Sequence, residues 1–532
     1  MAVTASGVAP GAGRREWIGL AVLTLPTLLL SLDLNVLYLA LPQLSAALAP
    51  DAAQLLWIMD IYGFMIAGFL VTMGTLGDRI GRRRLLMIGA AAFGVASVIA
   101  AYSTSAEMLI ATRALLGVAG ATLMPATLSL ISNMFRDARQ RTTAIGLWMS
   151  CFMIGAIVGP LVGGVLLESF WWGAVFLLGV PVMVLLLVAA PLLLPEYRNP
   201  EAGRVDLFSV LLSLATVLPF VYGLKELAKD GVGARPVLAM VAGVAVGVAF
   251  VARQRRLDSP LLDVRLFTDR TFSAALGVML LGGATIGGVA LLFAQYAQLV
   301  EGLSPLRAGL WMLPYAVSML IGSMLAPVLA RRFAPGHVVA GGMAIAAVGF
   351  ALLSRVGAAD GLGLAVTGLV IVYLGFGPGA VLGTDLIIGA APPERAGSAS
   401  SMSETSTELG VALGVAVLGS VGTAVYRGEI APALPGDLPA RVREAAGESL
   451  AGASAVTGQL PAQTGDALLE AARAAFTSGF NVAGTVSAVL AVILAVLSAL
   501  LLRRVRPADE PAGAAPAALA DGTDEASASA RG

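Results

Sequence analysis

Long apolar runs separated by short polar breaks dominate this chain. Each run has about 20 residues or more, the length that an α-helix needs to cross the hydrocarbon of a membrane. Charged residues or Pro and Gly turns bound the runs, which predict about fourteen membrane-spanning helices. They lie at 17–40, 54–74, 85–103, 107–132, 142–166, 172–194, 206–224, 236–252, 271–298, 306–330, 338–355, 363–388, 397–425 and 477–502.

Arginine clusters recur at alternate connections between these runs. They fall at the N-terminus, at every connection from an even-numbered to an odd-numbered helix, and at the C-terminus. Because cytoplasmic loops of membrane proteins carry the excess of Lys and Arg, we expect both termini to be cytoplasmic. An even number of helices requires the same.

The domain organisation follows from a faint internal repeat. The glycine-rich fifth helix is echoed by the thirteenth, which contains Gly410, Gly414 and Gly419. Two six-helix halves around an extra pair are the expected product of duplication, with a substrate site between the halves near the midplane. The predicted segments are a cytoplasmic N-terminus (1–16), an N-terminal bundle (17–195), two linker helices (196–260), a C-terminal bundle (261–505) with an extracytoplasmic loop (426–475), and a disordered cytoplasmic tail (506–532).

Composition supports an all-α membrane protein and excludes several function classes. Charged residues make up 12% of the chain, against about 25% in soluble domains. The net charge of +0 gives no basic field for nucleic acid. With one cysteine and one histidine, the chain offers neither an internal disulfide nor the ligands of a structural zinc site, and no cofactor is expected.

The chain also lacks the signatures of an enzyme. Its two lysines, Lys225 and Lys229, do not follow a glycine, so no Walker A loop is present to hold nucleotide phosphates. No nucleophile–base pair or metal cluster is apparent either. If the protein pumps, its energy therefore comes from an ion gradient or from another subunit.

Four acidic residues interrupt the apolar runs well away from their ends: Asp33 and Asp60 near the N-terminus, and Glu404 and Glu408 in the thirteenth run. A fifth, Asp385, lies late in the twelfth run and is expected at the membrane interface. Residues i and i+4 share one face of a helix, so the two glutamates point the same way. A carboxylate in hydrocarbon costs at least a few kcal/mol, and such residues usually face a water-filled path or a cation. The four acids indicate a protein that moves protons, cations or both.

Three further patterns carry chemistry or close packing. Arg113 lies inside the fourth run, and we expect it to face the bundle and pair with a carboxylate or a backbone carbonyl, with snorkelling to the interface as the alternative. The 74–84 connection allows a tight turn in which Asp78 can hold a neighbouring arginine. The fifth helix has glycines at small-xxx-small spacing beside a proline, so that helix backbones can approach closely. The residues concerned are Gly74, Gly77, Asp78, Arg79, Gly81, Arg82, Arg113, Gly117, Gly155, Gly159, Pro160, Gly163 and Gly164.

Together these patterns resemble the major facilitator superfamily. The 74–84 connection is similar to its loop signature, 109–121 to its fourth-helix signature, and 155–164 to the fifth-helix signature of its drug exporters. The segment 32–42 resembles the first-helix signature of the fourteen-helix drug:proton antiporters. The resemblance covers about 15–505, and it implies the major-facilitator fold.

Within that branch, the chain is most similar to efflux pumps for quaternary ammonium compounds and intercalating dyes. Asn35 stands where relatives usually have threonine, and Leu116 where they often have glutamine. The tenth run has no acidic residue, which favours monovalent lipophilic cations over divalent ones.

Because burial raises a carboxyl pKa and a nearby cation lowers it, a proton and a cationic drug can compete for the four intramembrane acids. We expect Asp33 to couple protons and Glu404 and Glu408 to bind the substrate, with Asp60 helping in proton coupling or in substrate binding. Trp148 and Tyr38 are the candidate aromatic contacts of the cation. The alternative for each acid is a structural role as the partner of an internal arginine or as a polar contact between helices.

The resulting hypothesis is a multi-pass, monomeric, proton-coupled multidrug antiporter of a bacterial inner membrane. Its partners are lipophilic cations, protons and the lipid bilayer. The sequence leaves a second hypothesis open, a dedicated exporter of one endogenous antibiotic or metabolite. Proton-coupled nutrient uptake and a non-transporting receptor are further alternatives, but Arg113 is the only strong base predicted inside the membrane.

Overall fold

The computed structural model describes residues 12–135, 137–198, 206–230, 233–257, 260, 262, 264–390, 396–434 and 438–502. Within these residues the regular structure is helical throughout, and fourteen helices are long and apolar enough to cross a membrane. The predicted number of spans and the all-α class are therefore confirmed.

The helices fall into three sets in chain order. The N-terminal set comprises α1 (Arg14–Leu48), α2 (Ala52–Ile80), α3 (Arg82–Ala101), α4 (Ala106–Met134), α5 (Ala138–Ser169), α6 (Ala174–Leu177) and α7 (Gly179–Leu193). A central pair follows, α8 (Leu207–Asp230) and α9 (Ala234–Gln254). The C-terminal set comprises η1 (Val264–Thr268), α10 (Arg270–Gln295), η2 (Tyr296–Val300), α11 (Pro305–Arg332), α12 (Pro335–Leu353), α13 (Leu362–Ala390), α14 (Ala396–Ala433), α15 (Ala440–Glu448), α16 (Leu450–Thr457) and α17 (Ala462–Leu501).

Side-chain caps begin many of these helices directly after short connections. A capping oxygen accepts a hydrogen bond from a backbone N–H that has no partner inside the helix. Such caps precede α2, α4, α5, α10 and α11 and are provided by Asp51, Ser105, Asp137, Asp269 and Ser304. They fix where each span begins, which hydropathy alone does not.

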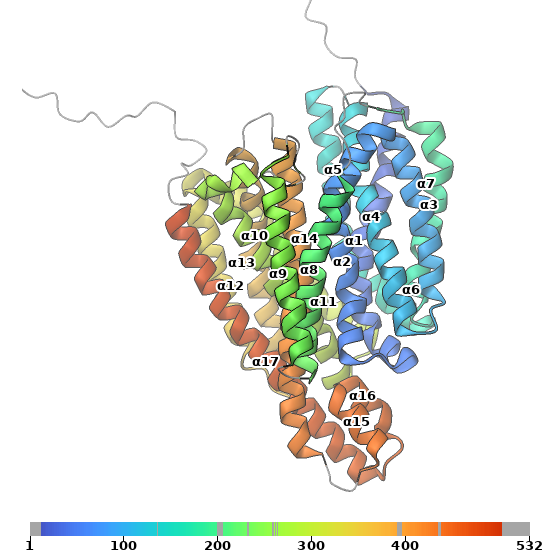
Figure 1. The fold of residues 1–532 in the computed structure, drawn as a ribbon, viewed down its shortest axis with the longest axis vertical. Coiled ribbons are helices and arrows are strands. Elements are labelled where there is room, and N and C mark those ends of the chain that lie inside the picture. The colour runs from blue at the N-terminus through green and yellow to red at the C-terminus, as the bar shows by residue number, and fades with distance from the viewer. Residues whose placement is uncertain are drawn as a thin grey trace, which may run out of the picture.

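The central pair lies beside both of the other sets rather than apart from them. Figure 1 shows the N-terminal set in blue to cyan on one side and the C-terminal set in yellow to red on the other, with α8 and α9 in green alongside. Helix α8 packs on α2 of the first set and on α14 of the second. The seam between α2 and α14 is therefore covered by α8.

Helices occupy most of the predicted 426–475 connection, as the alternation in Ala440–Ala451 and Thr464–Phe476 predicts. Helix α14 continues to Ala433 and α17 begins at Ala462, with α15 and α16 between them. The end of α14, helices α15 and α16, and the start of α17 project at the end of the molecule opposite the start of α1 and the end of α17 (Figure 1). The Tyr426 hydroxyl donates a 2.7 Å hydrogen bond to the Ala446 carbonyl, so packing of α15 against α14 sustains helix beyond the apolar run.

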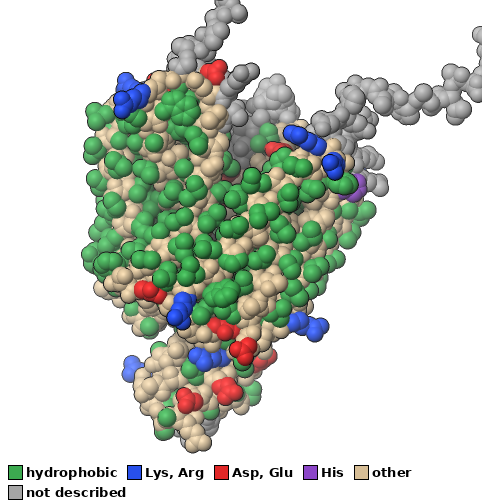
Figure 2. Space-filling model, turned by 180° about the vertical axis from the view of Figure 1, so that it is seen from behind, with side chains coloured by type: hydrophobic (Ala, Val, Ile, Leu, Met, Phe, Trp, Pro, Cys, Tyr) green, Lys and Arg blue, Asp and Glu red, His purple; other side chains and the backbone are tan. Residues whose placement is uncertain are grey.

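The N- and C-terminal sets touch mainly at the end that carries α15 and α16. There a Cβ at Gly419 of α14 would lie 2.5 Å from the Leu56 side chain of α2, and one at Gly164 of α5 would lie 2.5 Å from the Cα of Leu306 in α11. At the opposite, arginine-rich end, the two sets diverge in Figure 1, and the surface is notched between two lobes in Figure 2. The two sets of helices are thus in contact at the end that carries α15 and α16 and apart at the arginine-rich end.

Candidate functional site

The four predicted acids lie on three helices, of which α2 packs on α14 and also touches α1. Asp33 is on α1, Asp60 on α2, and Glu404 and Glu408 are on α14. Gly63, one turn after Asp60, packs on α14, where a Cβ would lie 3.9 Å from the Glu408 carbonyl oxygen. Asp60 and the glutamates therefore belong to one helix–helix contact, although they come from opposite ends of the chain.

Asp33 is paired with Arg113. The Arg113 Nη1 lies 3.0 Å from Asp33 Oδ2, and the arginine side chain is 1% exposed. Its Nε donates a 3.3 Å hydrogen bond to the Ile58 carbonyl, and its guanidinium carbon lies 4.4 Å from the Tyr62 ring centroid. The arginine thus faces the bundle and contacts both a carboxylate and a backbone carbonyl, as expected, rather than snorkelling.

Asp60 is paired with Lys225, which lies one residue beyond the end of the seventh predicted run. Lys225 Nζ lies 2.7 Å from Asp60 Oδ2, and neither side chain is exposed. The same ammonium lies 3.7 Å from the ring centroid of Trp57. The seventh predicted run ended at 224, whereas α8 continues to Asp230, so Lys225 is a second buried base beside Arg113. The scarcity of lysine in the chain was the one sequence feature that could have drawn attention to Lys225.

The two glutamates differ from the two aspartates in having no resident cation. Glu404 is exposed and Glu408 is half-buried. Among the described residues, neither side chain has a hydrogen-bond or ion-pair partner. Two carboxylates one helical turn apart repel each other when both are charged, and this favours binding of a proton or another cation.

An aromatic cluster lies among the helices of both sets. The rings of Tyr315 (α11) and Tyr373 (α13) have centroids 4.6 Å apart, and Phe293 (α10) lies 6.0 Å from Tyr315. Tyr38 of α1 packs, half-buried, on the same apolar core. Trp148 lies elsewhere: it is buried, and its Nε1 donates a 3.3 Å hydrogen bond to Thr127 Oγ1 on α4. Tyr315 and Tyr373 were not predicted as members of this cluster, because no sequence motif surrounds them.

The connection between α2 and α3 is fixed by ion pairs and one glycine. Asp78 pairs with Arg82 at 2.5 Å, and Arg83 Nε lies 3.6 Å from a carboxylate oxygen of Glu196, which follows α7. Gly81 has φ +111°, and a Cβ there would lie 2.8 Å from the Glu196 Cδ. Glycine is required here both for the backbone and for the contact. The sequence analysis did not predict Glu196.

Glycines of the predicted fourth- and fifth-helix motifs bring helix backbones together. A Cβ at Gly117 would lie 2.6 Å from the Tyr62 carbonyl oxygen, and one at Gly163 would lie 2.7 Å from the Val36 side chain. A Cβ at Gly155 would clash with the Leu28 carbonyl oxygen. Helix α5 thus packs on α1, just as α14 packs on α10, which fits the expected repeat.

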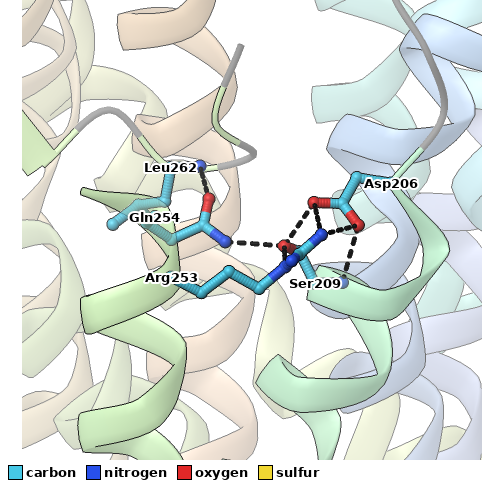
Figure 3. Close-up of polar contacts among 5 residues, drawn as sticks. All are labelled: Asp206, Ser209, Arg253, Gln254 and Leu262. Atoms are coloured by element: carbon cyan, nitrogen blue, oxygen red, sulfur yellow. Dashed lines mark hydrogen bonds and ion pairs between the residues drawn. The ribbon is translucent and has the colours of Figure 1, made fainter. Parts of the chain in front are cut away.

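At the cytoplasmic end, a polar cluster ties α8 to α9 and to the segment before η1 (Figure 3). Arg253 Nη2 lies 3.0 Å from Asp206 Oδ1, and Gln254 Nε2 donates a 2.7 Å hydrogen bond to Ser209 Oγ. The Leu262 N–H donates to Gln254 Oε1 at 3.2 Å. Burial tends to raise the pKa of Asp206, but hydrogen bonds from Ser209 and the charge of Arg253 together lower it below its ordinary value.

An apolar cavity of about 310 Å³ lies where α8 covers the seam. Helices α2, α10 and α14 contribute to its wall through Phe64, Leu280 and Leu409. Leu214 of α8 closes it from the other side. The central pair therefore contributes to the interior of the protein as well as to its surface.

The comparisons with known proteins decide the family. The model of the Major Facilitator Superfamily matches residues 23–415. This chain belongs to that superfamily. It is 44% identical over 475 residues to the "Multidrug efflux pump LfrA" of Mycolicibacterium smegmatis, a match that covers 89% of this chain and 94% of LfrA. It is 35% identical to the "Methyl viologen resistance protein SmvA" of Salmonella typhimurium (88% and 94% covered). It is 32% identical to the "Tetracenomycin C resistance and export protein" of Streptomyces glaucescens (91% and 93% covered).

Solved structures agree with this major-facilitator fold. A bacterial homolog of the human lysosomal transporter Spinster, in an inward-facing and unoccupied conformation, matches with a TM-score of 0.65 at 18% identity, covering 93% of this chain and 98% of that one. The resemblance and the fold expected from sequence are therefore confirmed. The chain is a multi-pass transporter of the bacterial cytoplasmic membrane, close to multidrug efflux pumps, and it is not an enzyme.

Proposed function

We propose that this major facilitator exports lipophilic cations, mainly monovalent ones, in exchange for protons. The observation that carries the proposal is the contrast between the four acids. Asp33 and Asp60 each face a resident cation at 3.0 Å or less, whereas Glu404 and Glu408 have no such partner among the described residues. Two unpaired carboxylates beside the seam suit a transported cation.

The names of the relatives support the substrate class. One relative is called a multidrug efflux pump and another a methyl viologen resistance protein. Methyl viologen is an organic dication, so these names support organic cations as the substrate class, whereas the preference for monovalent ones rests on the lack of an acidic residue in the tenth predicted run. Lipophilic cations reach such a site because their apolar surface tolerates the membrane while their charge seeks a carboxylate. Tyr38, Tyr315 and Tyr373 offer aromatic faces that attract a cation further. Trp148 is a further candidate for contact with the cation, but its indole N–H already donates a hydrogen bond to Thr127, which fixes the ring against α4.

A proton and a cationic drug compete for carboxylates in this mechanism. Protons that bind from outside displace the drug outward, and proton loss to the cytoplasm restores the affinity for the cation. Asp33 is proposed to carry the proton: when protonated, it no longer balances Arg113. Asp60 is proposed to assist either in proton transfer or in binding the cation. Each net charge that moves through 100 mV is worth about 2.3 kcal/mol.

The remaining motifs are assigned to the conformational change. We take 17–195 and 261–505 as the two moving halves and 196–260 as the linker between them. The loop of Gly74, Gly77, Asp78, Arg79, Gly81 and Arg82 would hold the cytoplasmic ends of α2 and α3. Arg113, Gly117, Gly155, Gly159, Pro160, Gly163 and Gly164 would keep α1, α2, α4, α5 and α11 closely packed as rigid bodies.

The test uses proteoliposomes with an imposed pH gradient. Wild type is expected to move ethidium in a gradient-dependent manner, while Asp33→Asn and Glu404→Gln lose that movement. Glu429→Gln is the matched control, because Glu429 is an exposed acid on the same helix α14, beyond the seam. Gradient-independent movement, or full activity in Asp33→Asn, would contradict proton coupling through Asp33. No movement by folded wild type would remove the multidrug assignment.

One comparison favours a second candidate, a dedicated exporter of one endogenous compound. A tetracenomycin C resistance and export protein matches over 91% of this chain, as fully as LfrA (89%) and SmvA (88%) do, although at the lower identity of 32%. A panel of structurally unrelated monovalent cations separates the two. A multidrug exporter moves several of them with comparable apparent affinity, whereas a dedicated exporter moves none or one.

A further inference from the structure

Lys225 is the only described lysine side chain buried against an intramembrane acid, and no motif accounts for it. Its helix α8 belongs to the central pair, outside the two bundles that form the substrate path in the proposed function. Yet the Lys225 and Asp60 side chains are 0% exposed, with 2.7 Å between Nζ and Oδ2. A buried ammonium needs such a partner, because an unpaired charge in a low-dielectric interior is very costly.

The surroundings of this ion pair make it part of the seam between the two sets of helices. Trp57 of α2 faces the ammonium at 3.7 Å. Beside it, Phe64 of α2, Val221 of α8, and Ala412 and Ala416 of α14 form one buried apolar cluster. Water is therefore kept from the pair by side chains of three helices. Lys225 is held in place by packing on both sides of the seam.

The pair also determines how much charge the seam carries. Without Lys225, Asp60 would add a third unbalanced carboxylate beside Glu404 and Glu408. With Lys225 in place, Asp60 is balanced and the negative charge available to a transported cation is that of the two glutamates. An unbalanced unit charge about 10 Å from a bound cation alters its affinity by roughly tenfold or more at an effective dielectric constant of about 20.

We propose that Lys225 is a positioning residue for cation transport: the linker helix α8 supplies the resident counter-ion of Asp60 and thereby sets the charge of the substrate site. The link to transport rests on the proposed function. The ion pair between Lys225 and Asp60 is observed independently of it. It assigns the central helix pair a direct part in cation recognition. Asp60 acts through its balance with Lys225, not as a separate carrier.

A double-mutant cycle tests the proposal with Asp60→Asn, Lys225→Met and the double variant in the full chain. Asp60→Asn leaves the Lys225 ammonium unbalanced, so the apparent affinity of this variant for ethidium should fall about tenfold or more. The double variant restores neutrality and should bind ethidium within about threefold of wild type. Lys225→Arg keeps the charge and should transport like wild type. Glu226→Gln, at the next position of α8, is the matched control.

Two outcomes would overturn the proposal. If the folded double variant is as impaired as Asp60→Asn, Asp60 acts directly on the proton or the substrate. If thermal unfolding shows the two single substitutions to be additive, the residues are not paired. Should wild type bind no ethidium, the proposed function fails, and the thermal cycle alone decides whether Lys225 balances Asp60: coupling supports the pairing and additivity refutes it.

Discussion

The contact between α10 and α14 gives a sharp test of the packing that holds the two glutamates. Gly414 of α14 lies so close to α10 that a Cβ would be 2.6 Å from both the Cα and the carbonyl carbon of Ala284, and closer still to its oxygen. Those atoms belong to a helix backbone and cannot rotate away. Gly414→Ala must therefore separate the two helices locally.

Gly428 provides a control in the same helix. It is exposed, and a Cβ there would have no neighbour within 4 Å. Gly428→Ala should stabilise the helix by about 0.5–1 kcal/mol, because alanine loses less backbone entropy. Gly414→Ala makes the same chemical change but overpacks the contact, which typically costs about 1–3 kcal/mol. Because the gain in backbone entropy is common to both, the two variants should differ by the overpacking cost of about 1–3 kcal/mol in the free energy of unfolding.

Thermal unfolding of the purified variants in one detergent measures this difference, with dye transport as the second readout. Gly414→Ala should unfold at a lower temperature than wild type and transport less, since Glu404 and Glu408 are carried on the displaced helix. Gly428→Ala should match or exceed wild type in stability and keep full transport. Equal stability of the two variants would refute the close approach of α10 and α14.

Three further predictions address charge and backbone at other places. Glu408→Gln should weaken ethidium binding while leaving thermal stability near that of wild type, because this carboxylate has no partner to lose; a large loss of stability would contradict this. Gly81→Ala should cost about 1–2 kcal/mol, through positive φ and the contact with Glu196, as measured by thermal unfolding. Because the pKa of Asp206 is lowered in the folded state, the stabilisation from its pairing with Arg253 is present above about pH 4 and is lost as the pH falls through the lowered pKa. The gap in melting temperature between wild type and Asp206→Asn should therefore shrink in acid, and a constant gap would contradict the pairing.

The spans were predictable because the bilayer imposes a length on every crossing helix. Apolar runs of that length located all fourteen of them. Their ends were less certain, since hydropathy stops at the membrane while helices do not. Helix α8 continues past 224 to Asp230, and α14 continues past 425 to Ala433. In both cases tertiary packing, of Lys225 or of Tyr426, stabilises turns that a window of apolar residues cannot register.

The candidate site was only partly predictable for a related reason. Acidic residues inside apolar runs are conspicuous in any sequence, so Asp33 and Glu404 could be named at once. Whether such an acid is balanced depends on a partner that lies 80 residues away for Asp33 and farther still for Asp60. Periodicity relates residues of one helix and says nothing of which helices touch. The pairing of Asp60 with Lys225 therefore required the fold.

The charges inside the membrane fall unequally on the two sets of helices. The pair Asp33–Arg113 is contained within α1 and α4, so while Asp33 is deprotonated the pair can move with the N-terminal set as a neutral unit. The ion pair between Lys225 and Asp60 attaches α8 to α2, and therefore to the N-terminal set. Two carboxylates with no partner among the described residues, Glu404 and Glu408, then lie on α14 across the seam. Under the proposed function, a cation bound there would be attracted by one set while it faced neutral pairs in the other, so separation of α2 from α14 would expose it without breaking an ion pair.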